Sequence, residues 1–134
     1  METVFTKIIN GDIPSVQIHA DDLCVVILDI APASKGHALV ISRDPYPTIA
    51  DCPEKVLGHL MAIVKRVDEI QREKLHAEAT NIVINNGKAA GQEVPHLHIH
   101  VIPRYANDGK RFVLQKETYG EGELERMGDS LRLS

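Results

Sequence analysis

The sequence contains few aromatic residues and almost no cysteine. Tryptophan is absent, aromatic residues make up 4% of the 134 residues, and Cys24 and Cys52 are the only cysteines. Two cysteines without a CxxC spacing predict neither a disulfide framework nor a zinc site. The scarcity of aromatic rings also leaves little surface on which the bases of a single-stranded nucleic acid could stack.

Long apolar runs and an excess of basic residues are absent as well. No apolar run approaches the roughly 18–20 residues that cross a membrane, and the first residues lack the basic and apolar segments of a secretory signal. The formal net charge is −4, and no basic stripe is available to neutralise phosphates. We therefore expect a cytoplasmic protein without a membrane or nucleic-acid partner.

The length and composition predict one folded domain spanning residues 1–134, because an ordinary core can form in a chain of this size. Short apolar or alternating runs predict strands at residues 16–19, 24–29, 37–42, 80–85, 96–104 and 111–115. Few of these runs are spaced for strand–helix–strand crossovers. We therefore expect an α+β fold with an antiparallel β-sheet.

One long helix and one short N-terminal helix complete the expected fold. The long helix is predicted to end near His76, and Asp51 and Glu54 match a capping box at its start, with Pro53 in the first turn. Its core-facing stripe repeats at helical spacing and comprises Val56, Leu57, Leu60, Met61, Val64, Val67 and Ile70 or Gln71. The short helix is expected at residues 4–10. The acidic segment YGEGELE, near the C-terminus, is expected to be a turn.

Three histidines alternate along one predicted strand. Successive side chains of a strand point to opposite faces, so His96, His98 and His100 are expected to share one face. A metal site is one interpretation, but the outer two Cα atoms of such a strand lie ~13 Å apart, so one ion would reach two imidazoles more easily than three. No second cluster of ligands is obvious in the sequence.

Phosphoryl chemistry is the interpretation we favour for this strand. One neutral imidazole can attack phosphorus while its neighbours position it and supply protons. A strand carbonyl close by can fix the tautomer of the attacking ring. Mutual repulsion allows only one of three packed imidazoles to hold an extra proton easily, so we expect one neutral attacker and one protonated donor.

The segment HLHIHVIPR resembles the signature of the histidine triad (HIT) family of nucleotide hydrolases and transferases. KIINGDIP, LDIAPASKGHALVI and NNGKAAGQEV precede it in family order and spacing. The resemblance covers residues 3–104 and fades over 105–134, a C-terminal extension whose role it does not indicate. It implies a HIT-like α+β fold and a homodimer built around the long helix and an edge strand.

The resemblance also implies a role for each histidine of the site. The middle histidine of the family triad attacks the α-phosphorus, and this role falls on His98. His100 would lie beside the scissile bond and the leaving group, and His96 would orient the cluster. A fourth histidine, His37 in KGHALV, would support the triad from a neighbouring strand.

A purine nucleotide site is implied around these histidines. Asp29 would hold the ribose hydroxyls, since a carboxylate can accept from both hydroxyls of a diol. Asn85, Gly91 and Gln92 match the phosphate loop, where glycine allows close approach and amides stabilise charge. The apolar slot for the base would be formed by Val4, Phe5, Ile8, Ile27 and Ile30. Because Ile27 replaces a common aromatic residue, we expect weak base selectivity.

The sequence departs from the family pattern in two places. Many relatives carry a structural zinc, but Thr3 and Thr6 stand at its cysteine positions and Asp44 and Pro45 stand where its histidine would be. We therefore expect no structural metal. Glu93 stands where Ser or Thr often contacts the leaving group, and a carboxylate there repels a transferring phosphate.

These features predict a hydrolase that needs no cofactor. It would cleave nucleoside 5′-phosphoramidates or related nucleotidyl conjugates through a covalent nucleotidyl-histidine intermediate. One alternative is a dinucleoside polyphosphate hydrolase, with magnesium accompanying its substrate. Others are a non-catalytic nucleotide-binding module and a metalloenzyme.

Overall fold

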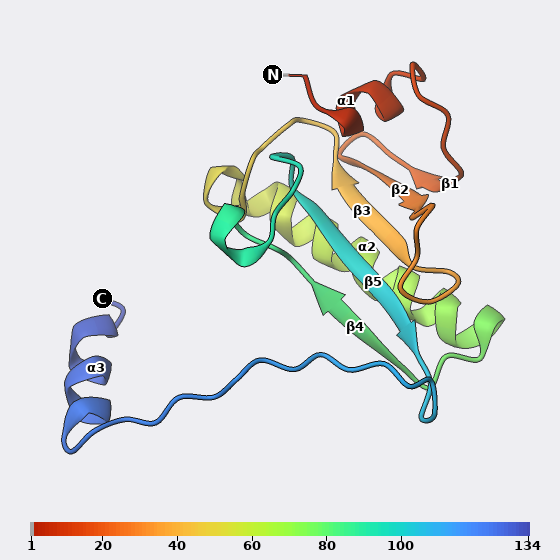
Figure 1. Ribbon diagram of the computed structural model, residues 1–134. Helices are drawn as coiled ribbons and strands as arrows, with labels where there is room; N and C mark the ends of the chain where they lie inside the picture. Colours follow the sequence, from red (N-terminus) through yellow and green to blue (C-terminus); the bar gives the residue numbers. More distant parts are fainter. Residues whose placement is uncertain (1) are drawn as a thin grey trace.

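A five-stranded sheet is the centre of the fold. In the computed structural model, which describes residues 2–134, the strand order is β1-β2-β3-β5-β4 (Figure 1). The strands are β1 Gln17–Ala20, β2 Cys24–Leu28, β3 Ala38–Ser42, β4 Ala79–Val83 and β5 His98–Arg104. Every neighbouring pair is antiparallel, which confirms the predicted α+β class.

Helices lie on both faces of this sheet. The α-helices are α1 Val4–Ile9, α2 Glu54–Leu75 and α3 Glu123–Leu131, and short 3₁₀ turns span Ile49–Asp51 and Lys88–Ala90. The long helix α2 packs Leu60 and Val64 on the face that carries Val40 and Ile99. On the other face the apolar core contains Phe5 of α1 together with Val25, Ile27, Leu39 and Ile41 of β2 and β3.

The ends of α2 agree only partly with the sequence prediction. His76 terminates the helix in a left-handed conformation with φ of 57°, as its predicted end suggested. The predicted capping box is wrong, because Pro53 is the N-cap residue and makes no side-chain cap. Asp51 instead bonds the amide and hydroxyl of Thr48, so its carboxylate caps the preceding 3₁₀ turn and is not available to α2.

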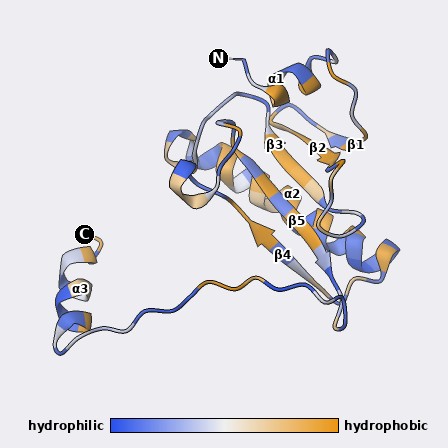
Figure 2. Cartoon of the chain, in the orientation of Figure 1, coloured by the Kyte–Doolittle hydropathy of each residue, from blue (hydrophilic) through white to orange (hydrophobic). Residues whose placement is uncertain are grey.

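The C-terminal extension also differs from its prediction. Residues 111–115 form no strand, and every residue from 111 to 134 is exposed. The segment expected to be an acidic turn contains one at Glu121 and Gly122, but its last three residues belong to α3. Figures 1 and 2 show an extended arm that carries α3 away from the sheet, with apolar stretches along it. An apolar run becomes a strand only where a neighbouring strand accepts its hydrogen bonds, and this arm lies beside none.

The histidines are positioned by β5, which lies between β3 and the edge strand β4. It pairs with β3, with Leu39 opposite His100 and Ile41 opposite His98. Strand β5 begins at His98, so His96 lies just before it and not within it as predicted. None of the helices in residues 2–134 combines the length and the apolar character needed to cross a membrane.

Candidate active site

A pocket opens on the sheet face that carries α1. His98 and His100 lie side by side in it, with ring centroids 5.1 Å apart. The intervening Ile99 is fully buried against α2 on the opposite face. The alternation of the strand therefore separates the two imidazoles, which face a cavity of about 490 Å³, from the residues that anchor them.

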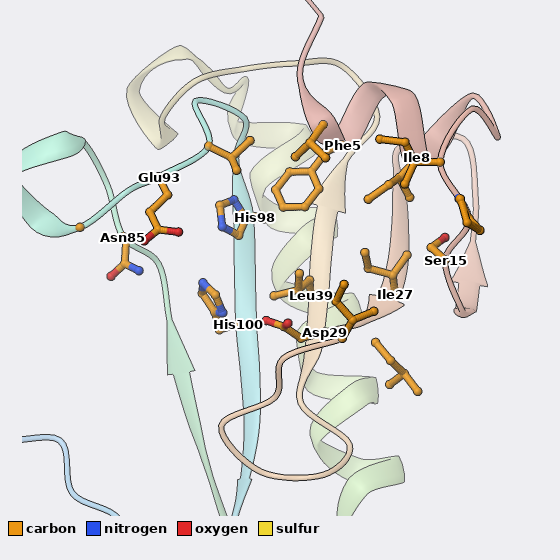
Figure 3. Close-up of a pocket in the computed structure, with 17 residues that line it drawn as sticks. Phe5, Ile8, Ser15, Ile27, Asp29, Leu39, Asn85, Glu93, His98 and His100 are labelled. Atoms are coloured by element: carbon orange, nitrogen blue, oxygen red, sulfur yellow. The ribbon is translucent and has the colours of Figure 1, made fainter.

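The pocket has an apolar side and a polar side. Figure 3 shows Ile8 and Ile27 on one side of the imidazoles, and Asn85 and Glu93 on the other, with Asp29 near His100. Of the predicted residues, those that line the pocket are Val4, Phe5, Ile8, Ile27, Asp29, Ile30, Asn85, Gly91, Glu93, His98 and His100. The predicted residues His37, His96 and Gln92 do not line it.

Several lining residues were missed by sequence reasoning. They are Ile13, Pro14, Ser15, Leu28, Leu39 and Val94. Leu39 could have been inferred from the pairing of its strand with the histidine strand, since the two residues opposite each other share a face. The loop residues 13–15 carry no signal of this kind, because only the path of the chain after α1 brings them to the pocket.

Backbone contact fixes the tautomer of His98. Its Nδ1 lies 2.7 Å from the carbonyl oxygen of His96, and because a carbonyl only accepts, Nδ1 must carry the hydrogen. In the neutral ring the lone pair is then on Nε2. Burial lowers the pKa of His98 below the usual value of 6.5, so the ring is neutral at pH 7.

A chain of hydrogen bonds fixes His100 in the complementary tautomer. The amide of Ala33 donates to Nδ1 of His37, so Nε2 of His37 carries its hydrogen and donates to Nδ1 of His100 at 2.9 Å. In neutral His100 the hydrogen is therefore on Nε2. Burial, together with His98 and His37, lowers the pKa of His100 to about 4.

These pKa shifts differ from the expected division of protons. In the free protein burial lowers the pKa of all the triad histidines, so none is a protonated donor at pH 7. Desolvation, which disfavours a charge, acts on every ring at once and adds to the repulsion that the sequence suggested.

His96 acts outside the cavity. It is completely buried, its Nε2 donates to the carbonyl of Ser42 at 2.6 Å, and its Nδ1 accepts from the hydroxyl of Thr3 at 2.7 Å. The Thr3 oxygen also accepts from the amides of Phe5 and Thr6 and so caps α1. The imidazole of His96 thus joins α1 to β3, while its backbone carbonyl orients His98.

Asp29 and Ile30 lie at the edge of the pocket. One carboxylate oxygen of Asp29 accepts from the amide of Ala31 at 2.9 Å, and the other lies 3.8 Å from Nε2 of His37. Asp29 is therefore oriented by its own turn. Ile30 is 96% exposed and can offer a nucleotide only a partial contact at the rim.

The loop between β4 and β5 is braced by Gln92. Its Oε1 accepts from the amide of Gly87, and its Nε2 donates to the carbonyls of Pro47 and Val94. The side-chain amide is therefore bonded within the loop and to Pro47 of the segment between β3 and α2, not to the pocket. Gly91, with φ of 96°, lines the pocket in a conformation that favours glycine.

One group of side chains at the pocket has metal-ligand character. Donor atoms of Asp29, His37 and His100 lie within 4.8 Å of one another. The Nε2 of His37 and Nδ1 of His100 already share a hydrogen bond, so an ion here would have to disrupt the contacts that set both tautomers.

Comparisons with known proteins agree with this geometry. The HIT domain family model matches residues 10–107. An uncharacterised HIT-like protein of Methanocaldococcus jannaschii is 43% identical over 107 residues, 80% of this chain and 82% of its own. The adenosine 5′-monophosphoramidase hnt1 of Schizosaccharomyces pombe is 38% identical over 104 residues, 78% and 75% of the two chains. A crystal structure of a HIT family member from Bacillus subtilis superposes with a TM-score of 0.89 at 32% identity, covering 100% of this chain and 99% of that one.

Proposed function

The chain belongs to the HIT domain family, whose members include named hydrolases, and we propose that it hydrolyses nucleoside 5′-phosphoramidates through a covalent nucleotidyl-His98 intermediate. The observation that supports this proposal most directly is the complementary pair of tautomers in one pocket. Neutral His98 has its lone pair on Nε2, and neutral His100 has its hydrogen on Nε2. A nucleophile and a hydrogen-bond donor therefore face the same cavity.

Different walls of the pocket would accommodate the base, the ribose and the phosphate of a nucleotide. The base would lie among the apolar side chains of Phe5, Ile8 and Ile27, and the ribose hydroxyls would donate to the Asp29 carboxylate. The phosphate would then reach the histidines, beside Asn85. The side chains of Phe5, Ile8 and Ile27 carry no hydrogen-bonding group that distinguishes one purine from another, and Ser15 is the hydroxyl side chain on this side of the pocket.

In the first step Nε2 of His98 attacks the α-phosphorus. The new P–N bond makes the imidazole cationic, and the His96 carbonyl that holds Nδ1–H stabilises this charge. The substrate phosphate favours uptake of one proton from solvent by the His37–His100 pair. As the bond from phosphorus to the leaving nitrogen breaks, its electron pair takes that proton and the amine leaves.

In the second step water replaces His98. With the amine gone, the His37–His100 pair is neutral again, and Nε2 of His100 would donate a hydrogen bond to the oxygen of the entering water. The water oxygen bonds to phosphorus, the bond to His98 breaks, and the nucleoside monophosphate leaves. The released electron pair restores the neutral His98 tautomer, and the proton lost by water returns to solvent.

Glu93 favours an amine over a polyphosphate as the leaving group. Its carboxylate lies beside His98 on the polar side of the pocket. A polyphosphate leaving group would bring several negative charges against this carboxylate, whereas an amine brings none. The dinucleoside polyphosphate alternative is thus the less favoured one.

Trapping the intermediate tests the proposal. Mixing the protein with adenosine 5′-phosphoramidate and quenching in acid-free denaturant should give one added adenylyl group by mass spectrometry, absent in His98→Ala. His96→Gln is not a suitable control because that ring is structural, so His76→Gln, an exposed histidine, serves as the matched variant. Full turnover by His98→Ala would refute the mechanism, and tight nucleotide binding without turnover would favour the non-catalytic module.

A further inference from the structure

Outside the pocket, side chains from the β1–β2 hairpin and from α2 converge on one carboxylate. The Oδ2 atom of Asp21 lies 2.8 Å from Nε2 of His19 and 2.8 Å from Nε2 of His59. The Sγ atom of Cys24 lies 3.5 Å from the same oxygen. His19 belongs to β1, Cys24 to β2 and His59 to α2, so three elements supply this cluster.

Three of these donors have a spacing close to that of a tetrahedral metal site, because donor atoms of His19, Asp21 and Cys24 lie within 4.8 Å of one another. His59 contacts this group through Asp21 and is not part of it, so its ring would have to move toward the other donors to complete the tetrahedron. In a tetrahedral zinc site with Zn–N near 2.0 Å and Zn–S near 2.3 Å, donor atoms are separated by roughly 3.3–3.7 Å. An ion would therefore open the two His–Asp contacts by about 0.5 Å.

The hairpin already orients the carboxylate. The other oxygen of Asp21, Oδ1, accepts from the backbone amides of Leu23 and Cys24 at 2.8 and 2.9 Å. These bonds aim Oδ2 at the cluster before any ion arrives. Partners of this kind fix the direction of a ligand and increase the affinity of metal sites.

The charges of the cluster match a divalent ion. A carboxylate, a thiolate and two neutral imidazoles carry two negative charges, so the complex with Zn²⁺ would be neutral, which lowers the cost of burying it. Without an ion, burial and Asp21 raise the pKa of Cys24 to about 12, while nearby Arg43 lowers it. Uptake of the ion therefore releases the Cys24 proton to solvent as the S–Zn bond forms.

We propose that His19, Asp21, Cys24 and His59 bind one Zn²⁺ ion that clamps the β1–β2 hairpin to α2. This mixed N, O and S donor set suits zinc. The position is distinct from the pocket and from the threonines at the start of α1. A surface hollow bordered by Asp21, Val56 and His59 gives access to it. Because β2 continues into Ile27 and Asp29, the clamp would stabilise one wall of the pocket.

Cobalt substitution tests this site without relying on enzymatic activity. Protein stripped with a chelator and titrated with Co²⁺ should take up one equivalent and develop a thiolate-to-cobalt charge-transfer band in the near ultraviolet. Cys24→Ser should lose this band. Cys52→Ser, which changes the other buried cysteine, should keep it. Circular dichroism on each variant checks that the fold is retained.

Zinc affinity gives an independent measurement. Titration calorimetry with Zn²⁺ should show His19→Gln and His59→Gln weakened by at least about tenfold, as loss of a ligand requires, and both side chains are exposed enough to be replaced without a buried gap. The proposal is wrong if no Zn²⁺ binds, or if binding survives these variants and disappears in His100→Gln, which would place the ion at the pocket. The first outcome leaves the hydrolase proposal untouched, whereas an ion at His100 would also affect the tautomers on which that proposal rests.

Discussion

At the scale of single residues, hydrogen-bond partners decide what each histidine can do. His96 and His98 are the same residue type two positions apart, yet both nitrogens of His96 are occupied while only Nδ1 of His98 bonds to a backbone carbonyl. The difference makes one ring a structural link and the other a candidate nucleophile. The role of His100 depends likewise on His37, which supplies the donor that sets its tautomer.

The lowered histidine pKa values predict activity that persists into mildly acidic solution. Because burial lowers the pKa of His98 below 6.5, its Nε2 lone pair remains available as the pH falls through 6.5. We expect kcat/KM for adenosine 5′-phosphoramidate to show no acid-side decline until the pH is below 6.5. A decline centred at or above 6.5 in a stopped-flow pH profile would contradict this.

Replacement of His100 should slow the reaction without abolishing it. Positioned acid–base help is worth ~10²–10⁴ in rate, so His100→Ala should lose about that factor in kcat and still form the nucleotidyl adduct at His98. A substrate whose leaving group needs no proton, such as a p-nitrophenyl ester of AMP, should restore most of the loss. Equal losses for both substrates would argue against a proton-supplying role.

The position of Glu93 predicts a leaving-group preference that changes when its carboxylate is removed. Glu93→Ser removes a carboxylate beside the phosphate, so the ratio of kcat/KM for diadenosine polyphosphate to that for phosphoramidate should rise by about fivefold, since one screened charge contact is worth about 1 kcal/mol. Glu93→Gln keeps the shape and should give most of the same change. An unchanged ratio in both variants would show that the carboxylate does not select the leaving group.

At the scale of elements, α1 is held by a link that no local pattern reveals. Thr3 caps the helix and at the same time donates to buried His96, 93 positions away. A six-residue helix is too short to be stable alone, so this link and the packing of Phe5 keep α1 over the pocket.

Thr3→Val should therefore destabilise the protein more than loss of an ordinary cap. The change removes the cap, worth ~1 kcal/mol, and leaves the buried Nδ1 of His96 without its donor, at a cost of roughly 1–3 kcal/mol. Urea denaturation should show a lower midpoint with an unchanged slope. Thr48→Val, which removes the exposed cap of the 3₁₀ turn, is the matched control and should cost less.

At the scale of the whole molecule, the C-terminal arm stands out because every residue from 111 to 134 is exposed. Exposed apolar side chains gather along it, including Phe112, Val113 and Leu114. In α3, Leu124, Met127 and Leu131 recur at helical spacing and form an exposed stripe. A nine-residue helix is marginal in water without a surface to pack on. The homodimer expected from the family resemblance would supply such a surface.

Light scattering after gel filtration should show a dimer that depends on the arm. Deletion of residues 111–134, or Leu131→Asp within α3, is expected to weaken the dimer by at least about tenfold, since burying a leucine is worth roughly 1.5–3 kcal/mol. Ser130→Asp adds the same charge beside the stripe and should leave the dimer intact. A monomeric full-length chain, or a truncated chain that dimerises equally well, would contradict this expectation.

Stability should fall in acid over a window set by the buried histidines. Burial lowers the pKa of His37, His96, His98 and His100 in the folded protein. The unfolded chain therefore binds more protons below its histidine pKa of about 6.5, so the stability is complete above that pH and decreases as the pH falls below it. Asp68, whose folded pKa is lowered by hydrogen bonds from Thr80 and Arg72, stabilises the fold above about pH 4 and loses this contribution only below that pH.

Calorimetry of the metal-free protein should show Tm decreasing between pH 7 and pH 5. His100→Asn removes the group whose pKa is lowered to about 4, and its Tm should depend less steeply on pH over the same interval. A Tm that is constant down to pH 5 would mean that these rings are not held neutral by burial.

Local periodicity in the sequence determined the strands, the long helix and the shared face of His98 and His100. Alternation and helical spacing act between neighbouring residues, so they hold wherever the chain adopts the element. The same reasoning failed for residues 111–115 and for the cap at Asp51, because a strand and a cap both depend on which partner is available. The roles assigned to the site residues stay predictions.

Only the tertiary structure decided the contacts that join distant segments. The pairing of His37 with His100 spans 63 positions, and that of Asp21 with His59 spans 38. Spacing in the sequence predicts neither contact, because each depends on how the sheet and α2 pack. Gln92 shows the same limit, because its position in the loop suggested a phosphate contact, whereas its side chain bonds to Gly87 of that loop and to Pro47 of the segment before α2. The periodicity of the sequence determines on which face of a helix or strand a side chain lies, but tertiary packing determines which residues contact that face.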